Sequence, residues 1–269
     1  MPLQNTLKSN LSLAIKDLKD GICSIHLWPM LGWQEIKQRY RRSLLGPLWL
    51  TISTGVMIGG MGPLYSKLFN QDLSVYFGFL AVSLVIWMLI SSLINESCLC
   101  FIAAEGFIKQ IKLPLTIYIL KVIWKNLIIF AHNLLILVVL LLFYPPPLAW
   151  QLLLAPLGVL LIAVNAIWLG LLLGLLCARF RDIPQLVSSV MQIAFFLTPI
   201  MWKADMLGKN GWMATINPIF HFLEVVRAPL VGSASSVLSW TVVLGTTVVG
   251  FAITLAMFAR FRSRIAYWL

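Results

Sequence analysis

Charged residues are scarce in this sequence, which excludes most soluble proteins. Only 11% of its 269 residues are charged, whereas a soluble domain has about 25%. Hydrophobic residues make up 60% of the chain, and the mean hydropathy is +0.93. A soluble globule of this length has too small an interior to bury so much apolar surface. The composition therefore excludes an ordinary soluble enzyme and a disordered chain, and it predicts an all-α integral membrane protein.

Catalytic and redox motifs are missing as well. The four cysteines form no C-x-x-C motif, and in the topology argued below they lie within apolar stretches or on one side of the membrane. We therefore expect neither a disulfide framework nor a zinc site. The sequence has no G-x-x-x-x-G-K-S/T motif, so it does not bind ATP through a P-loop. It also lacks G-x-S-x-G, H-E-x-x-H and a catalytic carboxylate pair. We expect no catalytic residue, no metal and no cofactor in this chain.

Long apolar stretches are what the sequence does contain, and they predict six transmembrane helices. Two of them are near 30 residues, so we expect these two to tilt or to project from the bilayer. The six stretches cover residues 48–65, 75–98, 114–144, 148–177, 185–202 and 237–259.

The basic residues indicate the orientation. Of the 20 lysines and arginines, 16 lie on the same side of the membrane as the two termini. They precede the first stretch, follow the sixth, or lie where the second and third stretches and the fourth and fifth stretches are joined. Lys67, Lys203, Lys209 and Arg227 lie on the other side. The positive-inside rule therefore places both termini in the cytoplasm. The charged residues lie between apolar stretches and do not form one basic face. The net charge of +11 therefore does not predict nucleic-acid binding. We expect a cytoplasmic N-terminal region (1–47), a membrane domain (48–260) and a cytoplasmic tail (261–269).

Residues 28–46 have the pattern of an amphipathic helix that lies in the cytoplasmic headgroup layer. Trp33, Ile36, Tyr40 and Leu44 recur at helical spacing, with charged residues between them. Membrane anchoring and docking of a cytoplasmic partner both remain open for this helix. A second, weaker amphipathic helix is expected at 7–18.

Two further segments are neither simple spans nor simple loops. Residues 103–113 predict a short helix before Pro114, either a connector or a cytoplasmic protrusion. Residues 203–236 are too apolar for a free loop and too broken by proline and glycine for a span, which predicts an outer re-entrant helix pair. Glu224 and Arg227 are spaced to pair there. His221 and Glu224 have a metal-like spacing, but hydrogen bonding is favoured because no third ligand is evident.

Polar residues inside the apolar stretches leave several interpretations open. His132 and Asn133 indicate either function or hydrogen bonding between helices. Asn95 and Glu96 either face a pore mouth or point to the cytoplasmic surface. No series of charges runs through the membrane centre, which disfavours a proton- or sodium-coupled pump.

Three sequence strings resemble polysaccharide-exporting ABC permeases of the type-2 exporter class. They are QRYRRSLLGPLWL at 38–50, RDIPQLVSSVMQIAFFLTPIMW at 181–202 and NPIFHFLEVVRAPLVG at 217–232. The resemblance covers nearly the whole chain, keeps the order of the motifs, and is nearest to subunits that export lipid-linked O-antigen polysaccharide. Capsule and teichoic-acid exporters share this architecture and remain alternatives. A membrane-embedded transferase acting on lipid-linked sugars, and a channel or secondary carrier without ATP, are the alternatives of other classes.

The resemblance implies a multi-pass protein of the bacterial inner membrane that acts as a homodimer. It further implies two copies of a separate P-loop ATPase, which would hold ATP and magnesium, and a polysaccharide substrate linked to undecaprenyl diphosphate. The first 27 residues form a longer N-terminal segment than the motif at 38–50 requires, and the resemblance implies no role for them. The expected ATPase-docking residues are Arg39, Arg41, Arg42, Glu105, Lys109, Arg181 and Asp182. The expected outer-gate residues are Trp212, Pro218, Phe220, His221, Glu224 and Arg227.

A path for a neutral polysaccharide should offer flat aromatic faces and hydroxyl-bonding groups. Sugar rings stack weakly on aromatic faces through their C–H edges, so the polymer can slide. The alternative for such aromatics is the interfacial belt, or packing. The candidates are Trp49, Tyr65, Tyr76, Trp87, Phe195 and Phe196.

Overall fold

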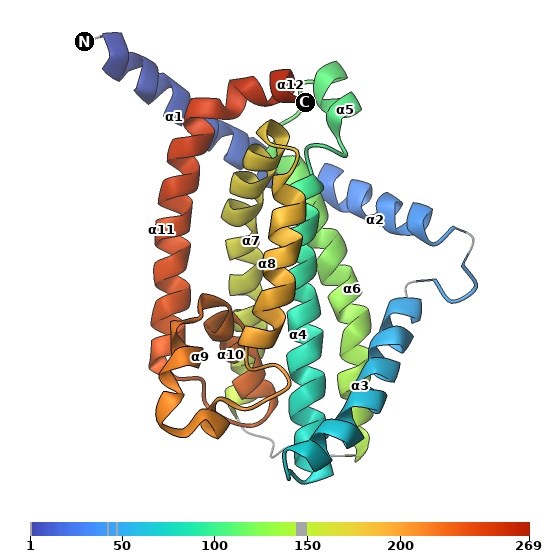
Figure 1. Ribbon diagram of the computed structural model, residues 1–269. Helices are drawn as coiled ribbons and strands as arrows, with labels where there is room; N and C mark the ends of the chain where they lie inside the picture. The colour runs from blue at the N-terminus through green and yellow to red at the C-terminus, as the bar shows by residue number, and fades with distance from the viewer. Residues whose placement is uncertain (1, 42, 47, 144–149) are drawn as a thin grey trace.

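The computed structural model describes residues 2–41, 43–46, 48–143 and 150–269, and the regular elements of this part are all helices (Figure 1). Each of the six apolar stretches contains a helix. These helices are α3 (Leu48–Leu68), α4 (Leu73–Leu99), α6 (Thr116–Phe143), α7 (Leu154–Arg179), α8 (Ile183–Leu197) and α11 (Val237–Phe261). The other helices are α1 (Pro2–Cys23), α2 (Leu27–Arg39), α5 (Glu105–Gln110), α9 (Trp212–Ile216), α10 (Pro218–Leu230) and α12 (Ile265–Trp268), with 3₁₀ turns η1 (Trp150–Leu153), η2 (Ala204–Asn210) and η3 (Arg262–Arg264).

Four helical stretches within the described residues are long and apolar enough to cross a membrane. They are Leu73–Leu99, Thr116–Leu140, Trp150–Arg179 and Val237–Trp268. Helix α8 has 15 residues, which corresponds to about 22 Å and is shorter than a hydrocarbon core of about 30 Å. We expected this stretch to run to residue 202, but Thr198 is extended because a residue before proline avoids the helical conformation.

Helix α4 forms the centre of the bundle. Most of its residues are buried, and it packs against α3, α6, α7, α8 and α10. Both chain ends and α5 lie at one end of the bundle, whereas α9 and the start of α11 lie toward the opposite end (Figure 1). Thr51 of α3 donates a hydrogen bond to Asn133 of α6 (3.1 Å), and His132 contacts the carbonyl of Ile128 within α6. His132 and Asn133 of α6 therefore both have hydrogen-bonding roles.

Helix α10 lies inside the bundle. The Asn217 side chain accepts a hydrogen bond from Ile219 N at its first turn, and Pro218 is its first residue, as expected at a helix start. The helix packs against α4, α7 and α11. A Cβ on Gly158 of α7 would lie 2.8 Å from the carbonyl oxygen of Val225. Glycine at 158 therefore permits the close approach of α10 to α7.

Helix α2 is shorter than the expected helix at 28–46. It ends at Arg39, and Leu44 lies beyond it and is fully exposed. Its buried residues are Gly32 and Ile36, because this face packs on α6, whereas Trp33 is 46% exposed. The expectation of one face shared by Trp33 and Leu44 was therefore wrong. Helix α5 covers only six residues of the expected 103–113, and α1 is longer than the expected 7–18.

Candidate functional site

Aromatic and polar side chains line one open cavity between α4 and α8. Its volume is about 480 Å³. The lining positions recur every four residues on α4 and every three or four on α8, so each helix turns one face toward the cavity. None of the described residues that line it is charged. The lining residues are Trp87, Ser91, Asn95, Ser188, Met191, Gln192, Phe195 and Phe196.

Three aromatic rings line this cavity together. The ring centroids of Trp87 and Phe195 are 5.6 Å apart, and those of Phe195 and Phe196 are 5.3 Å apart. Trp87 is only 7% exposed, whereas Phe196 is 68% exposed. The buried Trp87 thus supports the wall, and the exposed face of Phe196 is free for contact with a ligand or a lipid chain.

Polar groups complete the lining. The Asn95 amide donates a hydrogen bond to the carbonyl oxygen of Ser91 (2.8 Å) and lies 3.2 Å from its hydroxyl. Ser188 and Gln192 contribute a hydroxyl and an amide from α8. Such groups both donate and accept hydrogen bonds, which suits a ligand rich in hydroxyls. Sequence reasoning missed Ser91, Ser188 and Gln192, although Ser91 lies four residues from Trp87, and Gln192 and Ser188 lie three and seven residues from Phe195, which is helical spacing.

The other three expected channel aromatics lie elsewhere. Tyr76 is fully buried, and its hydroxyl donates to the carbonyl of Met201 (2.6 Å). The ring of Tyr65 stacks on Phe69, with the centroids 5.8 Å apart. Trp49 is 57% exposed near the start of α3. The structure therefore separates these residues from the cavity between α4 and α8.

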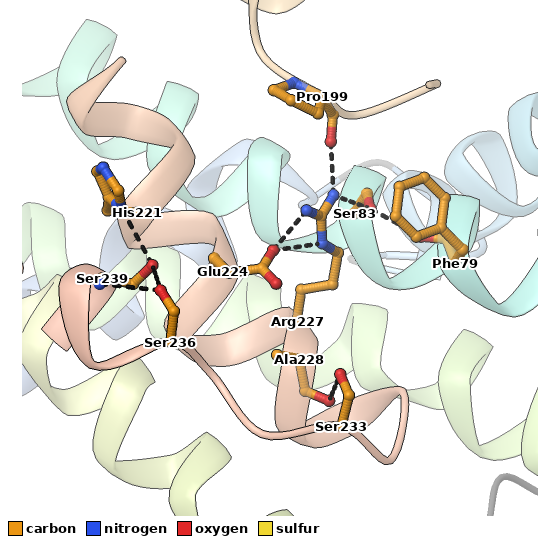
Figure 2. A network of polar contacts seen from close by, with 10 residues as sticks. All are labelled: Phe79, Ser83, Pro199, His221, Glu224, Arg227, Ala228, Ser233, Ser236 and Ser239. Carbon is orange, nitrogen blue, oxygen red and sulfur yellow. Dashed lines mark hydrogen bonds and ion pairs between the residues drawn. The ribbon is translucent and has the colours of Figure 1, made fainter. Parts of the chain in front are cut away.

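Arg227 links α10 to two other parts of the bundle (Figure 2). Its side chain is 6% exposed and pairs with Glu224, with Nε 3.1 Å from Oε2. The guanidinium also donates to the carbonyl of Pro199, after α8, and to the hydroxyl of Ser83 on α4 (3.3 Å). It lies over the ring of Phe79, 4.6 Å from the centroid. The expected pairing of Glu224 with Arg227 is thus present in a buried network.

The other expected gate residues lie on α9 and α10. The two ring nitrogens of His221 contact the hydroxyl of Ser239 (3.0 Å) and the carbonyl of Thr215 (2.8 Å). Its ring also packs against Phe220, with centroids 5.3 Å apart. Trp212 on α9 is 55% exposed. His221 therefore has the hydrogen-bonding role, while Glu224 faces Arg227.

The expected docking residues form one cluster and several separate positions. Glu105 accepts a hydrogen bond from Lys109 (2.6 Å), which lowers the pKa of the exposed Glu105 carboxyl, and lies 3.9 Å from Arg181. Asp182 is exposed at the start of α8. The remaining three expected residues lie apart from this cluster or outside the description: Arg39 pairs with Glu96 of α4 (3.8 Å), Arg41 is exposed, and Arg42 lies outside the described residues.

An ionic junction connects α2 with α4 and α6, and sequence reasoning missed it. Glu35 of α2 pairs with Lys121 (2.8 Å) and with Lys125 on α6. Lys125 also contacts Glu96 of α4 (2.9 Å), and Glu96 accepts a hydrogen bond from Asn126 (2.6 Å). Burial alone would raise the pKa of Glu35, but the hydrogen bonds from the two lysines outweigh it and hold this pKa below its usual value.

Four apolar helices able to cross a membrane and a bundle of this order define a multi-pass helical membrane protein. Residues 26–231 match the family described as ABC-2 type transporter. The chain therefore belongs to the ABC-2 type transporter family. Helix α1 lies before the matched residues.

Relatives of the chain carry a more particular description. It is 23% identical over 198 residues to the O-antigen export system permease protein RfbA of Myxococcus xanthus, covering 72% of this chain and 76% of that protein. It is 24% and 25% identical to two proteins of the same description from Klebsiella pneumoniae, over 77% and 87% of this chain and 75% and 91% of theirs. The chain is thus an ABC-2 permease with homologues in O-antigen export.

Proposed function

We propose that this chain is the membrane subunit of an ATP-driven exporter that moves lipid-linked polysaccharide of the O-antigen type across a bacterial inner membrane. It acts as a homodimer with two copies of a separate P-loop ATPase, which bind ATP and magnesium. The chain has no P-loop of its own, in keeping with an energy source on another subunit. The relatives named for O-antigen export support the substrate class.

The observation that carries the proposal is the uncharged cavity between α4 and α8. Its aromatic faces are placed beside hydroxyl and amide groups. A neutral polymer needs weak, repeated contacts so that it can advance, and buried charges would hold charged groups instead. Trp87, Phe195 and Phe196 supply the stacking faces in this proposal, and Ser91, Asn95, Ser188 and Gln192 supply the hydrogen bonds.

A second copy of the chain would complete the path. One side of α8 carries an exposed apolar stripe at helical spacing, made of Leu186, Val190, Ile193 and Leu197. This stripe extends beside the cavity on the same short helix. In the proposed homodimer it packs against the other copy, so that the two α8 helices border one path.

The proposed orientation places the end with both termini in the cytoplasm. In this topology α3 and α8 complete six crossings, with α8 continued by the residues after Leu197. The α5 cluster of Glu105, Lys109 and Arg181, together with α2, then contacts the ATPase. The pair α9 and α10 is re-entrant from the outer side and gates the exit, and Arg227 fixes its position.

Purification of the tagged chain from its native membranes tests this proposal. We expect a P-loop ATPase to co-purify, and we expect a deletion strain to lose surface polysaccharide while lipid-linked polymer accumulates inside. Absence of an ATPase together with unchanged surface polysaccharide would refute the exporter. Normal polymer synthesis in the deletion strain distinguishes export from a transferase activity.

A further inference from the structure

We propose that α1 is a strap that binds the anionic surface of the membrane with its outward side, while Asp17 on its inward side fixes it across the ends of α6 and α11. This interaction goes beyond the proposed export function. It also concerns a part of the chain that precedes the residues matched by the family. Figure 1 shows α1 crossing the end of the bundle where both termini lie.

The inward side of α1 is fastened by a buried carboxylate. Asp17 is 2% exposed. Its Oδ1 accepts hydrogen bonds from the backbone N (3.1 Å) and hydroxyl (2.9 Å) of Thr116, and its Oδ2 accepts from Leu115 N (3.2 Å) and from Arg262 Nε (2.8 Å). A buried charge needs such partners, because an unpaired one would be costly. Asp17 therefore holds α1 to the start of α6 and to the residue that follows α11.

Close packing beside Asp17 fixes the rotation of α1. Ala14, Asp17 and Gly21 recur at helical spacing and are all buried. A Cβ on Gly21 would lie 2.7 Å from the Cβ of Thr116. Only a glycine at position 21 lets α1 come this close to Thr116 without moving either helix. This contact therefore also determines which residues of α1 face outward.

The junction lies at the level where apolar helices begin and end. Thr116 is the first residue of α6, and Arg262 directly follows α11; both helices belong to stretches able to cross a membrane. Asp17 thus places α1 at the end of the bundle where α6 begins and α11 ends.

The outward side of α1 carries an apolar stripe next to lysines. Leu11, Ile15 and Ile22 share one stripe by their spacing and are 41%, 50% and 49% exposed. Lys16 and Lys19 are exposed beyond it. A helix with this division lies in the plane of the interface, with apolar side chains toward the acyl chains and lysines toward anionic headgroups. The exposed apolar stripe and the lysines beside it therefore favour lipid as the occupant.

Fluorophores on single cysteines test the proposal in the full-length protein. A Cys23→Ser background removes the exposed thiol and leaves Cys98, Cys100 and Cys177, which are buried. Ile15→Cys places a polarity-sensitive label on the stripe, and Asp20→Cys places a matched label about 140° around the helix. The labelled protein is reconstituted in phosphatidylcholine vesicles with or without phosphatidylglycerol, and nitroxide-labelled lipid is the quencher.

We expect severalfold stronger quenching at position 15 than at position 20. Phosphatidylglycerol should increase the difference, and Lys16→Gln with Lys19→Gln should abolish that increase. Asp17→Asn should lower quenching at position 15 because the strap is released. Equal quenching at both positions would overturn the proposal, as would protection of position 15 by a co-purifying protein in detergent. Export is not part of the readout, so the result is independent of the proposed function.

Discussion

Lys125 of α6 lies 2.9 Å from Glu96 of α4, nitrogen to oxygen, and it contacts Glu35 of α2 with the same ammonium group. Its side chain is only 7% exposed. Removing a charged group from water costs free energy unless its partners compensate for the lost hydration. The pairing therefore joins the amphipathic helix α2 to the centre of the bundle, and Asn95, the neighbour of Glu96, lines the cavity between α4 and α8.

The first prediction concerns the stability provided by this junction. Lys125→Met removes the cation that Glu35 and Glu96 share, while Glu35 keeps Lys121 and Glu96 keeps Asn126. It should lower the free energy of unfolding by about 2 kcal/mol, as expected for lost hydrogen bonds to charged groups. Glu35→Gln leaves Lys125 paired with Glu96 and should cost about 1 kcal/mol. Lys109→Met removes an exposed pair with Glu105 and should cost less than about 0.5 kcal/mol. Thermal unfolding in one detergent measures the order, and equal losses for all three variants would contradict the role given to burial.

The second prediction concerns the α5 cluster as a docking surface for the ATPase. Glu105→Lys reverses the charge that pairs with Lys109 and Arg181. The variant should still insert, because Glu105 is exposed, yet it should bind the ATPase roughly tenfold more weakly, equivalent to about 1.4 kcal/mol. Co-purification and ATP hydrolysis of the complex measure this. Asp20→Lys, an exposed carboxylate on α1, is the matched control; an equal loss in that variant would indicate a general charge effect.

The long apolar helices of this fold could be predicted from the sequence, but the junctions around Asp17 and Lys125 could not. Continuous apolar runs and proline positions locate α4, α6, α7 and α11 within a few residues. Asp17 and Lys125 give no local signal, since their partners lie far along the chain and pairing depends on how the helices pack. Tyr76 and Phe196 are both aromatic residues on apolar helices, and only the three-dimensional packing buries one and exposes the other.

The third prediction concerns the position of α10. Arg227→Lys keeps the charge but removes the planar fork that reaches Glu224, Pro199 and Ser83 together. It should lower the free energy of unfolding by about 2 kcal/mol, since buried acceptors lose their donors. Arg260→Lys on the exposed side of α11 should change it by less than about 0.5 kcal/mol. Similar unfolding temperatures for the two variants would argue against Arg227 as the residue that fixes α10.

The last prediction concerns the aromatic face of the cavity, and Phe196 permits a clean test. Because Phe196 is 68% exposed, Phe196→Ala should leave folding, dimerisation and ATPase binding unchanged. Contacts to a ring face are worth about 0.5–1.5 kcal/mol, and a transport barrier that is higher by ~1 kcal/mol lowers the rate about fivefold. We therefore expect roughly fivefold slower appearance of surface polysaccharide.

Two further variants separate stacking from simple apolar bulk. Phe196→Trp keeps a flat face and should retain export, whereas Phe196→Leu keeps apolar bulk without the face and should behave like the alanine variant. Val248→Ala on α11 is the control, because Val248 is 71% exposed and lies outside the cavity lining. Pulse labelling of newly exported polysaccharide measures the rates, and cross-linking checks the dimer. If Phe196→Leu exports as fast as the unaltered protein, apolar bulk suffices at this position and the ring does not act by stacking on sugars.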